Sequence, residues 1–193
     1  MNEVLGREDV VEPKSVDDPQ LVRVELNWEG PFSFKELLLT KEYKEKFKCS
    51  GVYLWKTPDS NVVEYVGRAS GNPSLWVRQF QHYICLIGGH YHIPAPFTDT
   101  GIKWVCNHEN SEVLDTLFDE MKFNKVTAYG FRYAAAINIY LAKLSFDKVN
   151  RVERNLLYDL QPSTTDWGKK TAPDHPIILI HCGTFRPTRN HGV

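Results

Sequence analysis

Residues 51–67 read GVYLWKTPDSNVVEYVG, with two triplets in near mirror order, Gly51-Val52-Tyr53 and Tyr65-Val66-Gly67, at the two ends. Each triplet lies in a run rich in β-branched and aromatic residues, and the segment between the runs (residues 57–61) has the Pro, Asp, Ser and Asn residues typical of turns. The pattern predicts a β-hairpin. Because side chains alternate across a sheet, Tyr53 and Tyr65 share a face only if the loop has an odd number of residues. A three-residue loop at 58–60 would place them directly opposite each other.

The rest of the chain predicts an α/β (α+β) domain with a small mixed or antiparallel central sheet flanked by helices. Residues 134–144 are nearly all apolar, so their periodicity does not separate a buried strand from a buried helix, but the alternation of Ile137, Ile139 and Leu141 favours a strand. A turn is expected at 29–31. The other expected strands are 21–28, 102–106 and 177–182, and the expected helices are 34–47, 75–87, 111–123 and 146–160.

Two of the expected helices carry polar residues in notable positions. On the helix at 75–87, Arg78 and His82 lie together on the side opposite to most of its large apolar residues. On the helix at 146–160, Glu153 projects into the middle of the apolar stripe. A carboxylate on a buried helix face is costly unless a partner compensates it, so Glu153 requires an explanation.

Composition and charge restrict the class of protein. The 193 residues are 42% apolar and 24% charged, which predicts one globular domain with a real core. No apolar run is long enough to span a bilayer and the N-terminus lacks a signal-like segment, so we expect a soluble, cytoplasmic protein. The four cysteines have no regular spacing and are expected to be reduced thiols.

Charge is segregated along the chain. The net charge of −1 argues against binding of nucleic acid through bulk charge, so any such contact must be local. We expect a flexible acidic lead-in at 1–20, a strand and helix extension at 21–49, a core at 50–166 and a C-terminal extension with a basic tail at 167–193. Solvated polar termini are an alternative explanation of the same charges.

The ordered set of the two triplets, Arg78 on the following helix and Glu153 shortly before Pro162 resembles the GIY-YIG nuclease family, over roughly residues 50 to 166. The resemblance implies that the triplets form two strands of a small sheet beside one active site, which hydrolyses phosphodiester bonds with a single divalent metal, Mg²⁺ or Mn²⁺. By position, Tyr53 would be the general base or would orient the attacking water, and Tyr65 would support the scissile phosphate. Arg78 would neutralise its charge and Glu153 would bind the metal.

His82 matches the histidine that follows the arginine by one helical turn in restriction-type members, where it lies near the catalytic tyrosine. Elementary chemistry supports such a cluster, because a tyrosine with a pKa of about 10 is a poor base at neutral pH unless neighbours lower that pKa. A hard divalent ion prefers oxygen ligands and keeps several waters, so one carboxylate can suffice to hold it. A metal-binding role would explain Glu153 on its apolar helix face.

Further residues are candidates for contact with nucleic acid. Arg68 follows the second triplet and resembles a basic residue of the family at that place, and His90, Tyr91 and His92 lie in a loop that could reach DNA. The basic C-terminal candidates are Lys169, Lys170, Arg186 and Arg189.

One position departs from the family pattern. Many members have an asparagine a few residues after the late proline, whereas Pro162 is followed here by Ser163-Thr164-Thr165-Asp166, so Thr165 or Asp166 would have to take that role. A structural zinc held by residues such as Cys85, Cys106, His90, His92 and His108 is a separate hypothesis, although these residues lack the spacing of known zinc motifs.

The compact layout is similar to restriction-type endonucleases, in which a homodimer cuts both strands of palindromic double-stranded DNA. The alternatives are a non-catalytic nucleic-acid-binding module on the same scaffold, a structure-specific repair nuclease, and an interaction protein. In the last case, Tyr53 and Tyr65 would be core aromatics, Arg78 and His82 would be solvent-exposed, and Glu153 would be satisfied by an arginine.

Overall fold

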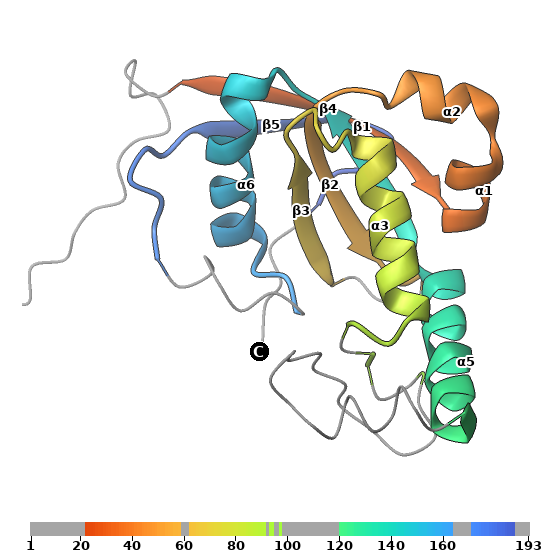
Figure 1. Ribbon diagram of the computed structural model, residues 1–193. Coiled ribbons are helices and arrows are strands. Elements are labelled where there is room, and N and C mark those ends of the chain that lie inside the picture. The colour runs from red at the N-terminus through yellow and green to blue at the C-terminus, as the bar shows by residue number, and fades with distance from the viewer. Residues whose placement is uncertain are drawn as a thin grey trace, which may run out of the picture.

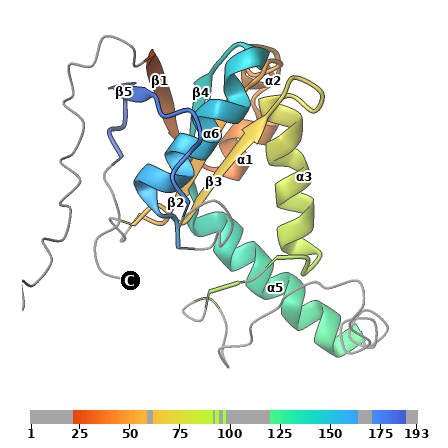
Figure 2. The ribbon, with the colours of Figure 1, turned by 90° about the vertical axis from the view of Figure 1, so that its left-hand side faces the viewer.

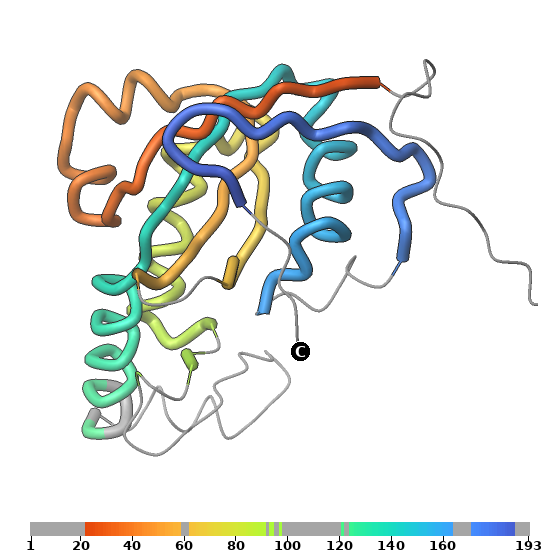
Figure 3. The backbone as a smooth tube through the Cα atoms, turned by 180° about the vertical axis from the view of Figure 1, so that it is seen from behind, coloured from red at the N-terminus to blue at the C-terminus, as the bar shows by residue number. Residues whose placement is uncertain are grey.

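The computed structural model describes residues 22–58, 62–91, 93–94, 97, 120–163 and 171–187. They form a five-stranded sheet of order β3-β2-β4-β1-β5. Strand β2 is antiparallel to both of its neighbours, β4 is antiparallel to β1, and β5 runs parallel beside β1 (Figure 3). The predicted mixed sheet with flanking helices is therefore confirmed. The strands are β1 (Arg23–Phe32), β2 (Gly51–Lys56), β3 (Tyr65–Ala69), β4 (Asn138–Lys143) and β5 (Ile178–Gly183).

Helices cover both faces of the sheet. On one face, Tyr53, Trp55 and Leu141 pack in a core with residues of α1 (Phe34–Leu39), α3 (Leu75–Ile87) and α5 (Glu120–Ala136). On the other face, Val52 and Leu54 pack against the apolar stripe of α6 (Phe146–Leu160). Figure 1 shows α3 and α6 on opposite sides of the sheet, and the short helix α2 (Lys41–Lys46) beyond α1.

The bounds predicted for α3 and α6 are those observed, because both helices have clear ends. The Ser74 side chain accepts a hydrogen bond from the Val77 amide at the start of α3. At the end of α6, Gln161 adopts a left-handed conformation with φ of 49°, directly before Pro162. Helix α3 does not bury its most apolar side, however, since Phe80 is 46% exposed. The buried side of α3 includes His82.

Two predictions near the N-terminal end of the described chain were wrong. Strand β1 continues through the expected turn at 29–31, where the pairing with β4 shifts register and Gly30 has a φ of 133° that favours glycine. The helix expected at 34–47 is broken at Thr40, a β-branched residue in an extended conformation that separates α1 from α2.

The ambiguous segment at 134–144 contains the end of a helix and a strand. Helix α5 runs to Ala136, as suits its three final alanines, and β4 begins at Asn138. The expected strand at 102–106 and all but the end of the expected helix at 111–123 lie outside the described residues. Within the described ranges, no helix is both long and apolar enough to cross a membrane.

Candidate active site

The two tyrosines of the hairpin lie on the same face of the sheet, as predicted, but not opposite each other. Tyr53 pairs with Gly67, and Tyr65 pairs with Trp55. The register therefore differs by two residues from that expected for a three-residue loop. The two tyrosine rings are diagonal neighbours on one face, with their centroids 6.0 Å apart.

The glycine opposite Tyr53 makes room for it. A Cβ atom at Gly67 would collide with the end of the Tyr53 ring and with its hydroxyl. The phenol of Tyr53 thus occupies space that any other side chain at 67 would fill, next to the edge strand β3. The glycine of the second triplet is required by packing against the tyrosine of the first.

A polar pocket of about 320 Å³ lies at this edge of the sheet. Four of the five residues predicted to be catalytic line it, namely Tyr53, Tyr65, Arg78 and Glu153. The fifth, His82, lies behind Tyr53, with Nε2 2.5 Å from the tyrosine hydroxyl oxygen. The other lining residues are Gly67, Arg68, Ala69, Ser70 and Pro73.

The pocket collects side chains from both faces of the sheet because β3 is an edge strand. Tyr53 and Tyr65 lie on the face that α3 covers, and Arg78 comes from α3 itself. Arg68 is on the alternate face of β3, toward α6, which supplies Glu153. Figure 2 shows β3 between α6 and α3, the arrangement that lets the two helices contribute to one site.

Glu153 is buried in the middle of the apolar stripe, as the sequence indicated, with only 3% of its surface exposed. Its Oε2 atom is 3.1 Å from Nη1 of Arg68, yet the contact lacks hydrogen-bond geometry, so this oxygen has an ion-pair partner but no hydrogen bond. Burial raises the pKa of the Glu153 carboxyl, and the positive charges of Arg68 and Arg78 offset part of this effect. The neighbouring arginines thus offset only part of the cost of burying the Glu153 carboxylate.

Tyr53 and Tyr65 are buried, and burial decides the direction of their pKa shifts. Burial raises the pKa of Tyr53 well above its usual value, and Arg78, although it interacts with the hydroxyl, offsets only part of that rise. The pKa of Tyr65 is raised by burial in the same way. Both phenols are therefore protonated at neutral pH, and Tyr53 can act on water only by passing its own proton on at the same time.

His82 is positioned to receive that proton. It is 1% exposed, which contradicts the alternative that His82 is a solvent-exposed residue of a polar helix face. Burial, with the charge of Arg78 as a smaller cause, lowers the pKa of His82 to about 3, so the ring is neutral at pH 7. Its second nitrogen, Nδ1, lies 2.7 Å from the Tyr91 hydroxyl. The sequence had suggested only that Tyr91 could contact DNA, and no pattern in it indicated this bond.

The donor set fits a magnesium-type ion better than a zinc ion. The described part of the chain contains no group of three or more His, Cys, Asp or Glu residues able to hold a metal. A single carboxylate with incomplete hydrogen bonding, in a polar pocket open to a phosphate, is a suitable protein ligand for Mg²⁺ or Mn²⁺. Of the residues considered for zinc, Cys85 and His90 are described, while His92, Cys106 and His108 lie outside the described residues.

Of the remaining candidates for DNA contact, the structure places Arg68 at the polar pocket. His90 is exposed just after α3. Arg186 is exposed after β5, the strand at the edge of the sheet opposite to β3. The candidates Lys169, Lys170, Arg189 and His92, together with Thr165 and Asp166, lie outside the described residues.

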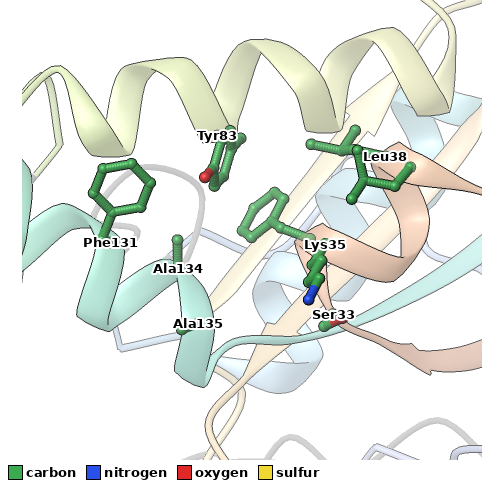
Figure 4. A pocket seen from close by; sticks show the side chains of 9 residues that line it. Ser33, Lys35, Leu38, Tyr83, Phe131, Ala134 and Ala135 are labelled. Atoms are coloured by element: carbon green, nitrogen blue, oxygen red, sulfur yellow. The ribbon is translucent and has the colours of Figure 1, made fainter.

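A second hollow, of about 390 Å³, has a different character. It lies between α1, α3 and α5, and its lining is mostly apolar, including Leu38, Tyr83, Phe131 and Ala134 (Figure 4). Among the described residues that line it, Lys35 is the one with a charge, and none is an acidic residue, a histidine or a cysteine.

Comparison of the chain with protein-family models, with curated proteins and with solved structures gave no match. The resemblance to the GIY-YIG family therefore rests on the residues of this chain and on their arrangement in space.

Proposed function

We propose that the protein is a metal-dependent endonuclease of the GIY-YIG type that hydrolyses phosphodiester bonds in DNA. The observation that carries the proposal is the convergence of residues 12 to 100 positions apart on one pocket. Tyr53, Tyr65, Arg78 and Glu153 line that pocket, and His82 is bonded to Tyr53. The interaction-protein alternative, with isolated core tyrosines, does not account for a polar pocket around them.

The arrangement supports a division of labour in hydrolysis. Arg78, next to both phenols, would neutralise the charge that develops on the phosphoryl oxygens. The attacking water would give a proton to Tyr53 while Tyr53 passes its own proton to His82 Nε2. The oxygen of that water forms the new bond to phosphorus, the bond from phosphorus to the leaving oxygen breaks, and the leaving oxygen takes a proton from solvent.

Substrate binding is expected to make His82 a better base. The charge of Arg78 is one cause of the low pKa of His82. A bound phosphate would neutralise part of that charge and so raise the pKa of His82 toward its usual value. The transfer of the Tyr53 proton to His82 would then be more favourable when DNA occupies the pocket, although burial, the larger cause of the low pKa, remains.

Glu153 would hold the divalent ion, which supplies charge stabilisation at the phosphate and activation of water. Arg68 would leave Glu153 for a phosphate oxygen of the DNA, a movement that its side chain, 40% exposed, allows. We further propose double-stranded DNA as the substrate and a restriction-type enzyme acting as a homodimer on palindromic sites, since His82 follows Arg78 by one helical turn and lies beside Tyr53, the arrangement that resembles restriction-type members.

A second candidate is a non-catalytic nucleic-acid-binding module. The observation that favours it is the ion pair between Arg68 and Glu153, because a carboxylate whose charge is balanced by an arginine needs no metal to balance it. The two candidates differ in what Glu153 does, so substitutions at this residue separate them.

The test is cleavage of supercoiled plasmid, branched DNA and single-stranded DNA with Mg²⁺ or Mn²⁺. Wild type would be compared with Glu153→Ala and Tyr53→Phe, and with the surface variants Glu45→Ala and Tyr43→Phe as matched controls. Discrete plasmid fragments that disappear in the two site variants and persist in the two controls would support a restriction-type enzyme. Cleavage confined to branched DNA would support a structure-specific nuclease.

Failure of the wild type to cut any of these substrates, with binding to DNA retained, would replace the nuclease by the binding module. Cleavage that survives Glu153→Ala undiminished would likewise exclude the proposed site. In that case the activity would have to come from other residues.

A further inference from the structure

We infer that Tyr91 is a positioning residue that keeps the His82 proton on Nδ1, so that Nε2 remains free to accept the proton of Tyr53. The inference deepens the proposed function and rests on it for its catalytic meaning. Its structural content is the direction of two hydrogen bonds, which can be measured without DNA.

Both ring nitrogens of His82 are engaged. Nε2 is 2.5 Å from the Tyr53 hydroxyl oxygen and Nδ1 is 2.7 Å from the Tyr91 hydroxyl oxygen. A neutral imidazole has one N–H, so one of these bonds is donated by the ring and the other is donated by a tyrosine. The position of that single proton decides whether His82 can serve as the acceptor in the relay.

The distances point to one of the two arrangements. An N–H that donates to oxygen typically lies at about 2.7–3.2 Å from it. The contact with Tyr53, at 2.5 Å, is shorter than this range. The contact with Tyr91 is compatible with an N–H donor. The geometry thus has Tyr53 donating to Nε2 and Nδ1–H donating to Tyr91.

The other neighbours of the two tyrosines are consistent with these directions. Tyr53 also interacts with Arg78, a guanidinium that can only donate. The Tyr53 oxygen can accept from Arg78 while its own proton points to Nε2. At the other end, Tyr91 interacts with the Cys85 thiol, whose sulfur can accept the Tyr91 proton.

The backbone holds Tyr91 in place for this role. The chain turns back at the end of α3, where the His90 amide donates to the Cys85 carbonyl at 2.8 Å and the Gly89 amide donates to the Leu86 carbonyl at 3.2 Å. The Tyr91 and His82 ring centroids are 5.5 Å apart. Tyr91 is therefore anchored to the helix that bears His82, and its hydroxyl approaches Nδ1 from the side away from Tyr53.

The experiment is ¹⁵N NMR of the full chain labelled at its seven histidines, at pH 7 and without DNA, with the His82 signals assigned by their loss in His82→Gln. Wild type is expected to show a protonated Nδ1 and an unprotonated Nε2. Tyr91→Phe should lose this preference. Tyr83→Phe, which removes a hydroxyl from the next residue of the same helix, should retain it.

In the cleavage assay, Tyr91→Phe is expected to lower kcat by about two- to twelve-fold, the effect of losing one hydrogen bond of ordinary net strength, with KM unchanged. Tyr83→Phe should leave kcat unchanged. A change in KM alone would contradict a positioning role in the relay.

The inference is overturned if wild-type His82 carries its proton on Nε2, a result that needs no variant. It is also overturned if Tyr91→Phe keeps the proton on Nδ1. If wild type shows the expected tautomer but cuts no DNA, the nuclease proposal fails while the assigned hydrogen-bond directions stand. The two failures can therefore be told apart.

Discussion

Lowering the pH from 7 to 5 is expected to destabilise the protein through His82. The pKa of His82 is about 3 in the folded protein, and about 6.5 is the ordinary value that applies after unfolding. Between these values the unfolded chain binds a proton that the folded protein excludes. Stability from this residue is therefore complete above pH 6.5 and is lost as the pH falls toward 3. By linkage, the loss between pH 7 and pH 5 is about 2 kcal/mol, and it reaches about 3 kcal/mol at pH 4.

The measurement is urea unfolding of wild type and His82→Gln at both pH values. Carboxylates and the other histidines contribute a pH dependence of their own, including His181, whose pKa is also lowered by burial. These contributions cancel when the variant is subtracted. The difference between the two proteins should change by about 2 kcal/mol from pH 7 to pH 5. A change below about 0.5 kcal/mol, the usual limit of additivity, would refute the view that His82 is held neutral by burial.

Three further predictions concern packing and charge, each measured as the free energy of unfolding. Gly67→Ala should cost about 1–3 kcal/mol, because the new methyl group collides with Tyr53, and it should abolish cleavage. Glu153→Gln, measured at pH 7 without metal, should leave stability unchanged or raise it, since the pKa of the carboxyl is raised by burial and folding disfavours its charged form. Tyr133→Phe should cost about 1–3 kcal/mol, because its hydroxyl donates to the buried Glu64 carboxylate at 2.5 Å.

Controls sharpen these three tests. Tyr43→Phe removes a tyrosine–glutamate hydrogen bond of 3.4 Å on the surface and should change stability by less than about 0.5 kcal/mol. A loss above about 1 kcal/mol in Glu153→Gln would mean that the ion pair with Arg68 is a structural support. A Gly67→Ala protein of unchanged stability would mean that the Tyr53 ring has room to move.

Local signals in the sequence predicted the elements that frame the site. The helices α3 and α6 were predicted with their observed bounds, and their ends are marked locally by Ser74 before α3 and by Pro162 after α6. The buried position of Glu153 followed from helical periodicity alone. Helix ends and helical periodicity depend on residues a few positions apart, so they can be predicted from the sequence without knowledge of the tertiary contacts.

What the sequence did not indicate depends on long-range contacts. The parallel pairing of β5 with β1 joins residues about 155 positions apart, and no local pattern specifies it. The register of the hairpin was off by two residues, because strand length and loop length cannot be separated when both runs are rich in β-formers. The exposure of Phe80 could not be foreseen either, since hydrophobic periodicity identifies an apolar side of α3 but not whether the sheet lies against it.

The buried ionisable groups around the polar pocket support the proposal that it is an active site. Burial raises the pKa of Tyr53 and of Glu153 and lowers that of His82, so in each case folding opposes the charged form. Apolar residues of similar volume would fill such positions at equal or lower cost in a protein that needed only a core. The Glu153 oxygen without a hydrogen bond is hardest to explain by packing, because Arg68 lies beside it without the geometry to satisfy it. Proton transfer and metal binding both require buried ionisable groups around an open pocket, and the described lining of the apolar hollow by α5 contains no such set of groups.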